Sequence, residues 1–165
     1  GAWDVRFVSD VNALLSPAEM VEMSGLDFIV GMQEGRLPAP PMCRTLNYWL
    51  EYVKEGEVHF RGRPTFDAMN PIGSVHGGWT GTILDSCMAC AVQTTLPKGK
   101  AYTTLEFKVN ILRAVMPDSG DYIARGVVDH CGRRTGMATG ELRHAQTGKL
   151  YAKGTTSCLV LDPKM

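Results

Sequence analysis

Four segments of alternating apolar and polar residues occupy the last two fifths of the chain. They span residues 102–112, 122–130, 135–144 and 150–161. Alternation with a period of two residues is the pattern of a β-strand that buries one face. Glycine-containing turn signals lie between the later segments at separations typical of hairpins. The pattern therefore predicts four strands, of which the last three form an antiparallel meander.

A hairpin and one long helix are predicted upstream of this region. Residues 43–53 and 57–63 have strand character and are joined by a tight turn over residues 54–56. After Gly81, no proline or glycine interrupts the chain until the break over residues 96–100, and this run predicts the helix. One long helix with about six strands is an α+β arrangement.

The N-terminal part of the chain predicts short helices. Ser16, Pro17 and Glu19 form a capping-box pattern with proline at the first helical position. A partly amphipathic segment follows over residues 26–32, before a glycine and three prolines. We expect residues 1–41 to form a helical extension that acts as a lid or flap, and residues 42–165 to form a single domain.

Composition restricts the partners and the compartment. The 165 residues are 44% hydrophobic, which suits one domain with a proper core. Basic and acidic residues balance at 17 each without runs, so neither nucleic acid nor an anionic membrane is an expected partner. No apolar stretch has bilayer length, no signal-peptide pattern is present, and the five cysteines are scattered as reduced thiols would be. We expect a cytoplasmic protein.

An aspartate occupies an unusual place in the predicted long helix. The apolar face of that helix comprises Thr80, Ile83, Leu84, Cys87, Met88 and Ala91. A neighbouring strip of small residues comprises Gly78, Gly81, Thr82, Ala89 and Val92. Asp85 lies on this strip, too deep in the helix to cap its N-terminus. It reaches solvent, pairs with a basic residue from elsewhere, or serves chemistry.

The motif His-Gly-Gly at residues 76–78 stands where loop becomes helix. Free N–H groups and the helix dipole at such a start favour an anion or a developing oxyanion. Alone, the motif is also ordinary turn chemistry. With Asn70 before it and Asp85 after it, the motif supplies an oxyanion site, an orienting amide and a carboxylate. These are the parts of an acyl-transfer site.

Other chemistries lack their motifs. The chain has no G-x-S-x-G, H-E-x-x-H, P-loop or Rossmann glycine fingerprint, which excludes serine hydrolases of the nucleophile-elbow type, zincins and P-loop NTPases. Cys87 and Cys90 form a C-x-x-C, but no second pair or nearby histidine completes a ligand set. We therefore expect no metal site.

Five stretches carry a family resemblance. They are residues 70–78, residues 83–86 with the carboxylate eight positions after Gly77, residues 102–113, residues 132–134 and residues 156–161. From about residue 40 onward, the sequence thus resembles the PaaI-like branch of the hotdog-fold acyl-CoA thioesterases. The resemblance implies a hotdog fold, in which an antiparallel sheet wraps one long helix. It also implies a homodimer, often paired into a homotetramer, with each active site at the dimer interface.

The resemblance implies roles for individual residues. The Gly77 N–H of one subunit would bind the thioester carbonyl oxygen, and Asp85 of the other would attack the carbonyl or activate a water. Asn70 and His76 would orient the substrate, helped by Gly78. The hydroxyl that holds the water or Asp85 would come from Thr104, with Thr103 as the alternative. Whether the carboxylate is nucleophile or general base stays open, because both roles need it in nearly the same place.

The expected substrate is a small aromatic or medium-chain acyl-CoA, hydrolysed without any cofactor. Coenzyme A carries phosphates, for which Arg113, Arg133 and Arg134 are candidate contacts. Two alternatives fit the same fold: a non-catalytic acyl-CoA binding or sensing protein, and an acyl-thioester hydratase or dehydratase. The hydratase would want a catalytic histidine and an acid at other spacings. The presence of Asp85 favours a hydrolytic enzyme over a sensor.

Overall fold

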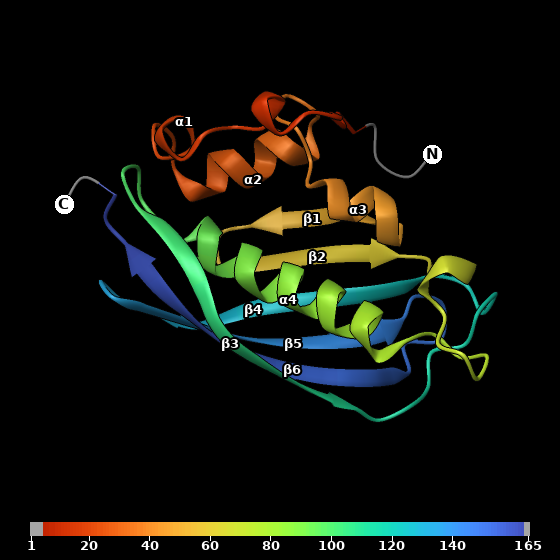
Figure 1. Cartoon of the computed structure of the whole chain (residues 1–165). Helices are drawn as coiled ribbons and strands as arrows, with labels where there is room; N and C mark the ends of the chain where they lie inside the picture. The colour runs from red at the N-terminus through yellow and green to blue at the C-terminus, as the bar shows by residue number, and fades with distance from the viewer. Residues whose placement is uncertain (1–4, 164–165) are drawn as a thin grey trace.

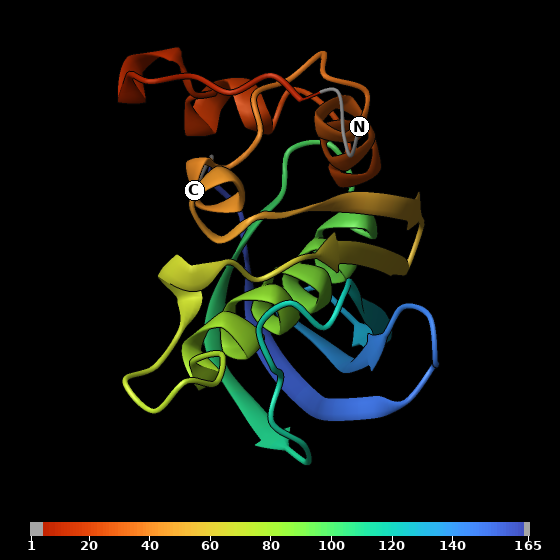
Figure 2. The same cartoon turned by 90° about the vertical axis from the view of Figure 1, so that its right-hand side faces the viewer.

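A six-stranded antiparallel sheet forms the body of the protein in the computed structural model, which describes residues 5–163. Its strands are β1 (Tyr48–Lys54), β2 (Glu57–Gly62), β3 (Ala101–Ile111), β4 (Tyr122–Cys131), β5 (Thr135–His144) and β6 (Leu150–Leu161). The order β1-β2-β4-β5-β6-β3 makes β1 and β3 the two edges. The long helix α4 (Gly77–Thr94) crosses one face of the sheet (Figure 1), and the sheet curves around it (Figure 2).

The predicted α+β arrangement is confirmed. β5 and β6 have the predicted bounds, the ends of β3 and β4 differ from prediction by one residue, and the last three strands form the expected meander. The predicted apolar face of α4 is buried against the sheet over its whole length. Hydrophobic periodicity, the turn signals and the absence of proline and glycine after Gly81 therefore located the helix and four of the strands.

The predicted first strand is wrong at its start. Pro41–Leu46 form the short helix α3, and β1 begins only at Tyr48. Pro41 stands at the first helical position, where its missing N–H costs nothing. Asn47 ends the helix in the left-handed conformation, with φ 56°, and its side-chain amide donates to the Arg63 carbonyl at 2.8 Å. The chain turns into the sheet at this asparagine.

The N-terminal extension packs on the end of α4. It contains a 3₁₀ turn (Val11–Ala13), α1 (Pro17–Met20) with the predicted capping box, and α2 (Gly25–Gln33). Ile29 and Met32 of α2 are buried in the same core as α4, and the Gly25 N–H donates to the Leu96 carbonyl at 2.9 Å. Figure 1 shows these helices above β1 and the C-terminal end of α4.

The predicted boundary between residues 41 and 42 falls inside α3. The predicted extension and domain also include residues 1–4 and 164–165, which lie outside the described residues. Whether the extension moves as a lid or flap stays a prediction. Within residues 5–163, no helix is long and apolar enough to cross a membrane.

A row of three glycines lets α4 lie directly on the sheet. Gly126 of β4 pairs with Gly140 of β5, which pairs with Gly154 of β6. A Cβ atom on Gly126 would lie 2.3 Å from the Cys87 carbonyl oxygen of α4. Cβ atoms on Gly140 and Gly154 would lie 2.9 and 3.1 Å from side-chain atoms of Met88. Because this row has no side chains, β4 comes against the helix backbone at Gly126, and the Met88 side chain fits over Gly140 and Gly154.

Replacing Gly126 with alanine is expected to destabilise the fold, because the new methyl group meets helix backbone that cannot turn aside. Overpacking of this kind costs about 1–3 kcal/mol or more. The free energy of unfolding in a chemical denaturant measures it. The control is Gly81→Ala in α4, whose Cβ would meet only the Phe107 ring at an ordinary 3.6 Å. An unchanged stability of the Gly126 variant would contradict the packing role of the glycine row.

Candidate functional site

The start of α4 presents one free backbone donor. His76 is the N-cap, and its Nδ1 accepts from the Gly78 N–H at 2.8 Å. The Trp79 N–H donates to the His76 carbonyl at 3.0 Å. Among residues 5–163, no group accepts from the Gly77 N–H, and Gly77 is exposed. This free N–H therefore lies at the positive end of the dipole of an 18-residue helix, on an exposed surface.

The loop before α4 is held by the Asn70 side chain. Its Oδ1 accepts from the N–H groups of Ile72 and Ser74 at 3.0 and 3.2 Å, and its Nδ2 donates to the Ser74 hydroxyl at 2.7 Å. The His76 N–H donates to the Ala68 carbonyl at 2.8 Å, which fixes the point where the helix begins. The amide of Asn70 thus organises the loop that carries the motif, and its contact with a substrate stays a prediction.

A shallow hollow of about 300 Å³ opens beside the helix start. Its lining residues are Leu46, Asp67, Ala68, Met69, His76, Gly78, Trp79 and Thr82. Three of them, Asp67, His76 and Gly78, are exposed. The hollow therefore offers an open, partly polar surface next to the free donor.

Asp85 carries the one buried side-chain polar atom that lacks a hydrogen-bond partner within residues 5–163, its Oδ1. None of the ion pairs formed by those residues includes Asp85. Burial raises the pKa of this carboxyl above its usual value. The sequence left two structural explanations for Asp85, a basic partner and exposure to solvent. No basic partner is found within residues 5–163, and exposure does not account for the buried Oδ1.

The surroundings of Asp85 are thiols and a phenol. Its carboxyl is among the nearby acidic groups that raise the pKa of Cys90 in α4, Tyr102 in β3 and Cys158 in β6, although burial is the largest cause for each. Sulfur groups are weak hydrogen-bond partners. They exclude water without neutralising the carboxylate.

A β-bulge in β3 decides which threonine faces Asp85. The register against β6 slips between Thr104 and Glu106, leaving Leu105 as the extra residue. Thr104 therefore pairs with the buried Cys158 on the α4 side, and its hydroxyl lies 4.0 Å from the Cys158 sulfur. Thr103 points to the other face and is exposed. Of the two threonines, Thr104 is thus the one on the side of the carboxylate.

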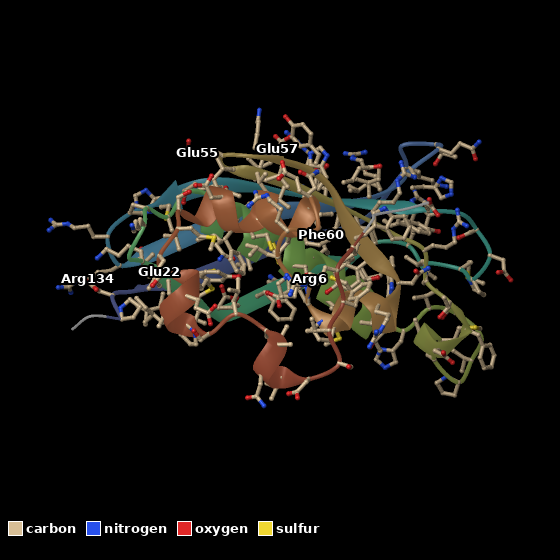
Figure 3. The ribbon with its side chains drawn as sticks, turned by 90° about the horizontal axis from the view of Figure 1, so that it is seen from above. Arg6, Glu22, Glu55, Glu57, Phe60 and Arg134 are labelled. Atoms are coloured by element: carbon tan, nitrogen blue, oxygen red, sulfur yellow. The ribbon has the colours of Figure 1, made fainter. Side chains whose placement is uncertain are left out.

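The three candidate arginines do not come together in one chain. The Arg113 N–H donates to the Tyr151 carbonyl, near the start of β6, whereas the Arg134 carbonyl accepts from the Val160 N–H, near its end. Nine residues of strand separate these points, about 30 Å. Arg133 and Arg134 are exposed in the β4–β5 turn, and Figure 3 shows Arg134 projecting from one end of the molecule.

The donor and the carboxylate are also separated within one chain. Gly77 and Asp85 are eight residues apart on α4. At 1.5 Å per residue, this spacing is about 12 Å along the helix axis. A single carbonyl group cannot touch both at once.

Sequence reasoning missed Tyr102 as a neighbour of Asp85. The alternation of β3 places Leu105, not Thr104, on the same face as Phe107, and only the bulge reverses this order. Nothing in the local sequence marks the bulge, because it is defined by pairing with β6. Among the described residues, no group of three or more histidine, cysteine or acidic side chains could hold a metal ion.

The sequence profile of the thioesterase superfamily matches residues 72–151, which include the helix motif, Asp85 and β3 to β5. A phenylacetic acid degradation-related protein from Ralstonia eutropha JMP134 is 30% identical, with a TM-score of 0.72 over 80% of this chain and 98% of that chain. The protein belongs to the thioesterase superfamily. Its six-stranded sheet around one helix is the hotdog fold of the PaaI-like branch, and as a member it is a hydrolase acting on thioesters.

Two further structures share the fold of this thioesterase. A hypothetical thioesterase protein with coenzyme A from Streptococcus pneumoniae TIGR4 is 26% identical, with a TM-score of 0.64 over 70% of this chain and 90% of that chain. The PaaI protein of the phenylacetic acid degradation operon of E. coli is 21% identical, with a TM-score of 0.67 over 74% and 85%, a likeness of fold alone. No match to the chain was found among the curated proteins compared.

Asp85→Asn is expected to stabilise this thioesterase at neutral pH. An acid whose pKa is higher in the folded state binds its proton more tightly there, so its ionised form opposes folding. The cost is present at high pH and vanishes as the pH falls below the unfolded pKa, near 4. Because solvent screens this half-exposed carboxyl, we expect a gain of less than about 1 kcal/mol in unfolding free energy at pH 7 and no gain in acid. A gain of the same size at every pH would contradict an effect of charge.

Proposed function

We propose that the protein is an acyl-CoA thioesterase that hydrolyses small aromatic or medium-chain acyl-CoA. The observation that carries this proposal is the half-buried carboxylate of Asp85, with one oxygen that no group in the described chain satisfies. A buried polar group without a partner lowers the stability of the fold, and such groups are typical of sites where a substrate binds and reacts. Asp85 would attack the thioester carbonyl or activate a water for that attack, and its raised pKa keeps it reactive as a base.

The active site would be shared by two subunits. The separation of about 12 Å between Gly77 and Asp85 along α4 rules out a shared target within one chain. An antiparallel α4 from a second copy would place its Gly77 N–H opposite Asp85. β3 suits this pairing because it is an edge strand whose Leu105, Phe107 and Ile111 are 60%, 45% and 51% exposed. We therefore propose a homodimer joined along β3 and α4.

In this dimer, the helix start would act as the oxyanion site. The Gly77 N–H of the partner would donate to the carbonyl oxygen as negative charge develops there. The His76 side chain accepts from the neighbouring Gly78 N–H. It would thereby hold the start of α4 in place and orient the Gly77 donor. Thr104, turned toward α4 by the bulge, would hold the attacking water or the Asp85 carboxylate.

The arginines would serve the coenzyme A part of the substrate. The bound coenzyme A of the S. pneumoniae relative supports a thioester of this kind as the substrate. An antiparallel dimer would bring the β4–β5 turn of one subunit, with Arg133 and Arg134, toward the α4 start of the other. Guanidinium groups bind phosphates through two parallel N–H donors, so these arginines would hold phosphates of coenzyme A. Further pairing of dimers, and the cytoplasm as the compartment, stay predictions.

Turnover should depend on both halves of the site. Asp85→Ala is expected to lower kcat by about 10²–10⁴ with acyl-CoA substrates, since it removes the base or nucleophile. Gly77→Pro deletes the N–H donor and is expected to cost about 10²–10³. Proline fits the first position of a helix, and the His76 backbone, with ψ 137°, suits a residue before proline. Thiol release from a panel of acyl-CoAs measures both.

Gly77→Ala is the matched control, because it adds a side chain and keeps the N–H. It should lose much less activity than the proline variant. Near-normal turnover of folded Asp85→Ala on every acyl-CoA would refute the proposed mechanism.

Mixed dimers test whether the site is shared. Co-expressed Asp85→Ala and Gly77→Pro subunits, carrying different affinity tags, form heterodimers with one site free of both changes only if the groups act across the interface. Random assortment should then restore about a quarter of the wild-type turnover. Purified heterodimers that are as inactive as either parent variant would show that donor and carboxylate act within one subunit.

A further inference from the structure

The ring of His76 lies over the first turn of α4, where residue 78 would otherwise carry a side chain. Its Nδ1 accepts from the Gly78 N–H at 2.8 Å. A Cβ atom on Gly78 would lie 2.9 Å from that Nδ1 and 3.3 Å from the ring Cε1, and the first distance is too short for any real Cβ contact. The imidazole therefore occupies space that only a glycine leaves open.

The conformation of Gly78 does not itself require glycine. The residue lies in α4, it is exposed, and its φ is not positive. Alanine forms helix better than glycine. The glycine is thus explained by the ring of His76 and by the hydrogen bond that the ring accepts.

That hydrogen bond requires a neutral imidazole. A ring nitrogen accepts only when it carries no proton, so His76 holds its proton on Nε2. Protonation of Nδ1 would turn two N–H donors toward each other and place a positive charge at the positive end of the helix dipole. Serine, threonine and asparagine, the common N-caps, do not titrate, whereas histidine changes its charge between about pH 5 and 8.

Few charged groups face the ring. Asp67 is the one other ionisable residue that lines the hollow beside His76, and none of the ion pairs formed within residues 5–163 includes either residue. β3 presents the apolar Ile111, whose Cδ1 would lie 3.1 Å from a Cβ atom on Gly77. In the proposed dimer, the partner's Asp85 would approach as well. Both carboxylates favour a protonated ring, and the N-cap hydrogen bond and the dipole favour a neutral one.

We propose that the protonation state of His76 controls the oxyanion donor. This inference rests on the proposed thioesterase function and deepens it. The Gly77 N–H lies between the two residues that the hydrogen bond joins, His76 and Gly78. Once the ring is protonated and the bond is lost, the donor is no longer held where the carbonyl oxygen develops charge, and hydrolysis falls. Gly78 serves by leaving room for the ring rather than by touching the substrate.

The dependence of kcat on pH tests this control with the best acyl-CoA of the panel. A general base must be unprotonated, so Asp85 alone would make kcat fall about tenfold per pH unit in acid. Protonation of His76 adds a second proton, and the steepest fall of the wild type should approach about 100-fold per unit. His76→Asn keeps an N-cap acceptor that does not titrate, so its fall should stay near tenfold per unit.

Two further variants separate positioning from substrate contact. His59→Asn is the matched control, because it makes the same replacement at a histidine of β2 that bonds to Glu57, and it should keep the steeper fall. Gly78→Ala should lower kcat at pH 8 by about 10²–10³, the contribution of one oxyanion donor. In a His76→Ala background, the same change should cost little more, since the ring that it displaces is already absent. A full additional loss there would overturn the positioning role of Gly78.

Nuclear magnetic resonance tests the N-cap without any substrate. The Gly78 amide proton should move upfield and exchange faster with solvent as the His76 ring titrates. An amide signal that stays unchanged would overturn the proposal, as would equal slopes for the wild type and His76→Asn, and both results would leave the thioesterase function standing if hydrolysis still depends on Asp85. Absence of turnover by the wild type on every acyl-CoA would instead overturn the proposed function, and with it the control of hydrolysis.

Discussion

The contact between the α4 backbone and the glycine row of the sheet is the constraint on which the rest of the structure depends. Gly126 leaves room for the Cys87 carbonyl and for nothing larger. Because α4 meets β4 through its backbone at Gly126, the height of the helix above this strand is set by main-chain geometry. Asp85, two residues before Cys87 on the same helix, inherits that fixed position. A reactive carboxylate held by backbone contacts needs little further ordering when a substrate arrives.

The site combines this rigidity with an unfavourable environment. A carboxylate among Cys87, Cys90 and Cys158 lies in surroundings that are apolar enough to oppose ionisation, and no group within residues 5–163 donates to its buried Oδ1. An aliphatic wall would exclude water equally well. A wall of serines or lysines would donate hydrogen bonds to the carboxylate and lower its reactivity as a base. The local loss of stability is tolerated because the remaining core is well packed around Tyr122, Phe60 and Ile83.

Much of the fold followed from periodic patterns, because burial of one face imposes the same period on every regular element. The bounds of β5 and β6 and the buried face of α4 were predictable for this reason. α3 was missed because six residues are too few to show a helical period, and its limits depend on Pro41 and on the left-handed Asn47. Short elements are specified by their end residues, whose effect is local and easily overlooked.

The candidate site was predictable only in part. His76, Gly77 and Asp85 are adjacent on one helix, so a sequence motif describes them. The separation of Arg113 from Arg134 depends on how β6 runs between them, and the inward orientation of Thr104 depends on the pairing of β3 with β6. Such relations arise from register between distant segments, and one sequence carries no local mark of them.

The bulge at Leu105 makes the side chain beside Asp85 depend on where β3 slips against β6. If the extra residue stood two positions earlier, Tyr102 would still face α4, but Leu105 would replace Thr104 beside Asp85. The same eleven-residue strand could thus present a hydroxyl or an aliphatic group to the carboxylate without a change in composition. Relatives that differ only in where this strand slips would share nearly identical sequences and yet surround their carboxylates with different chemistry.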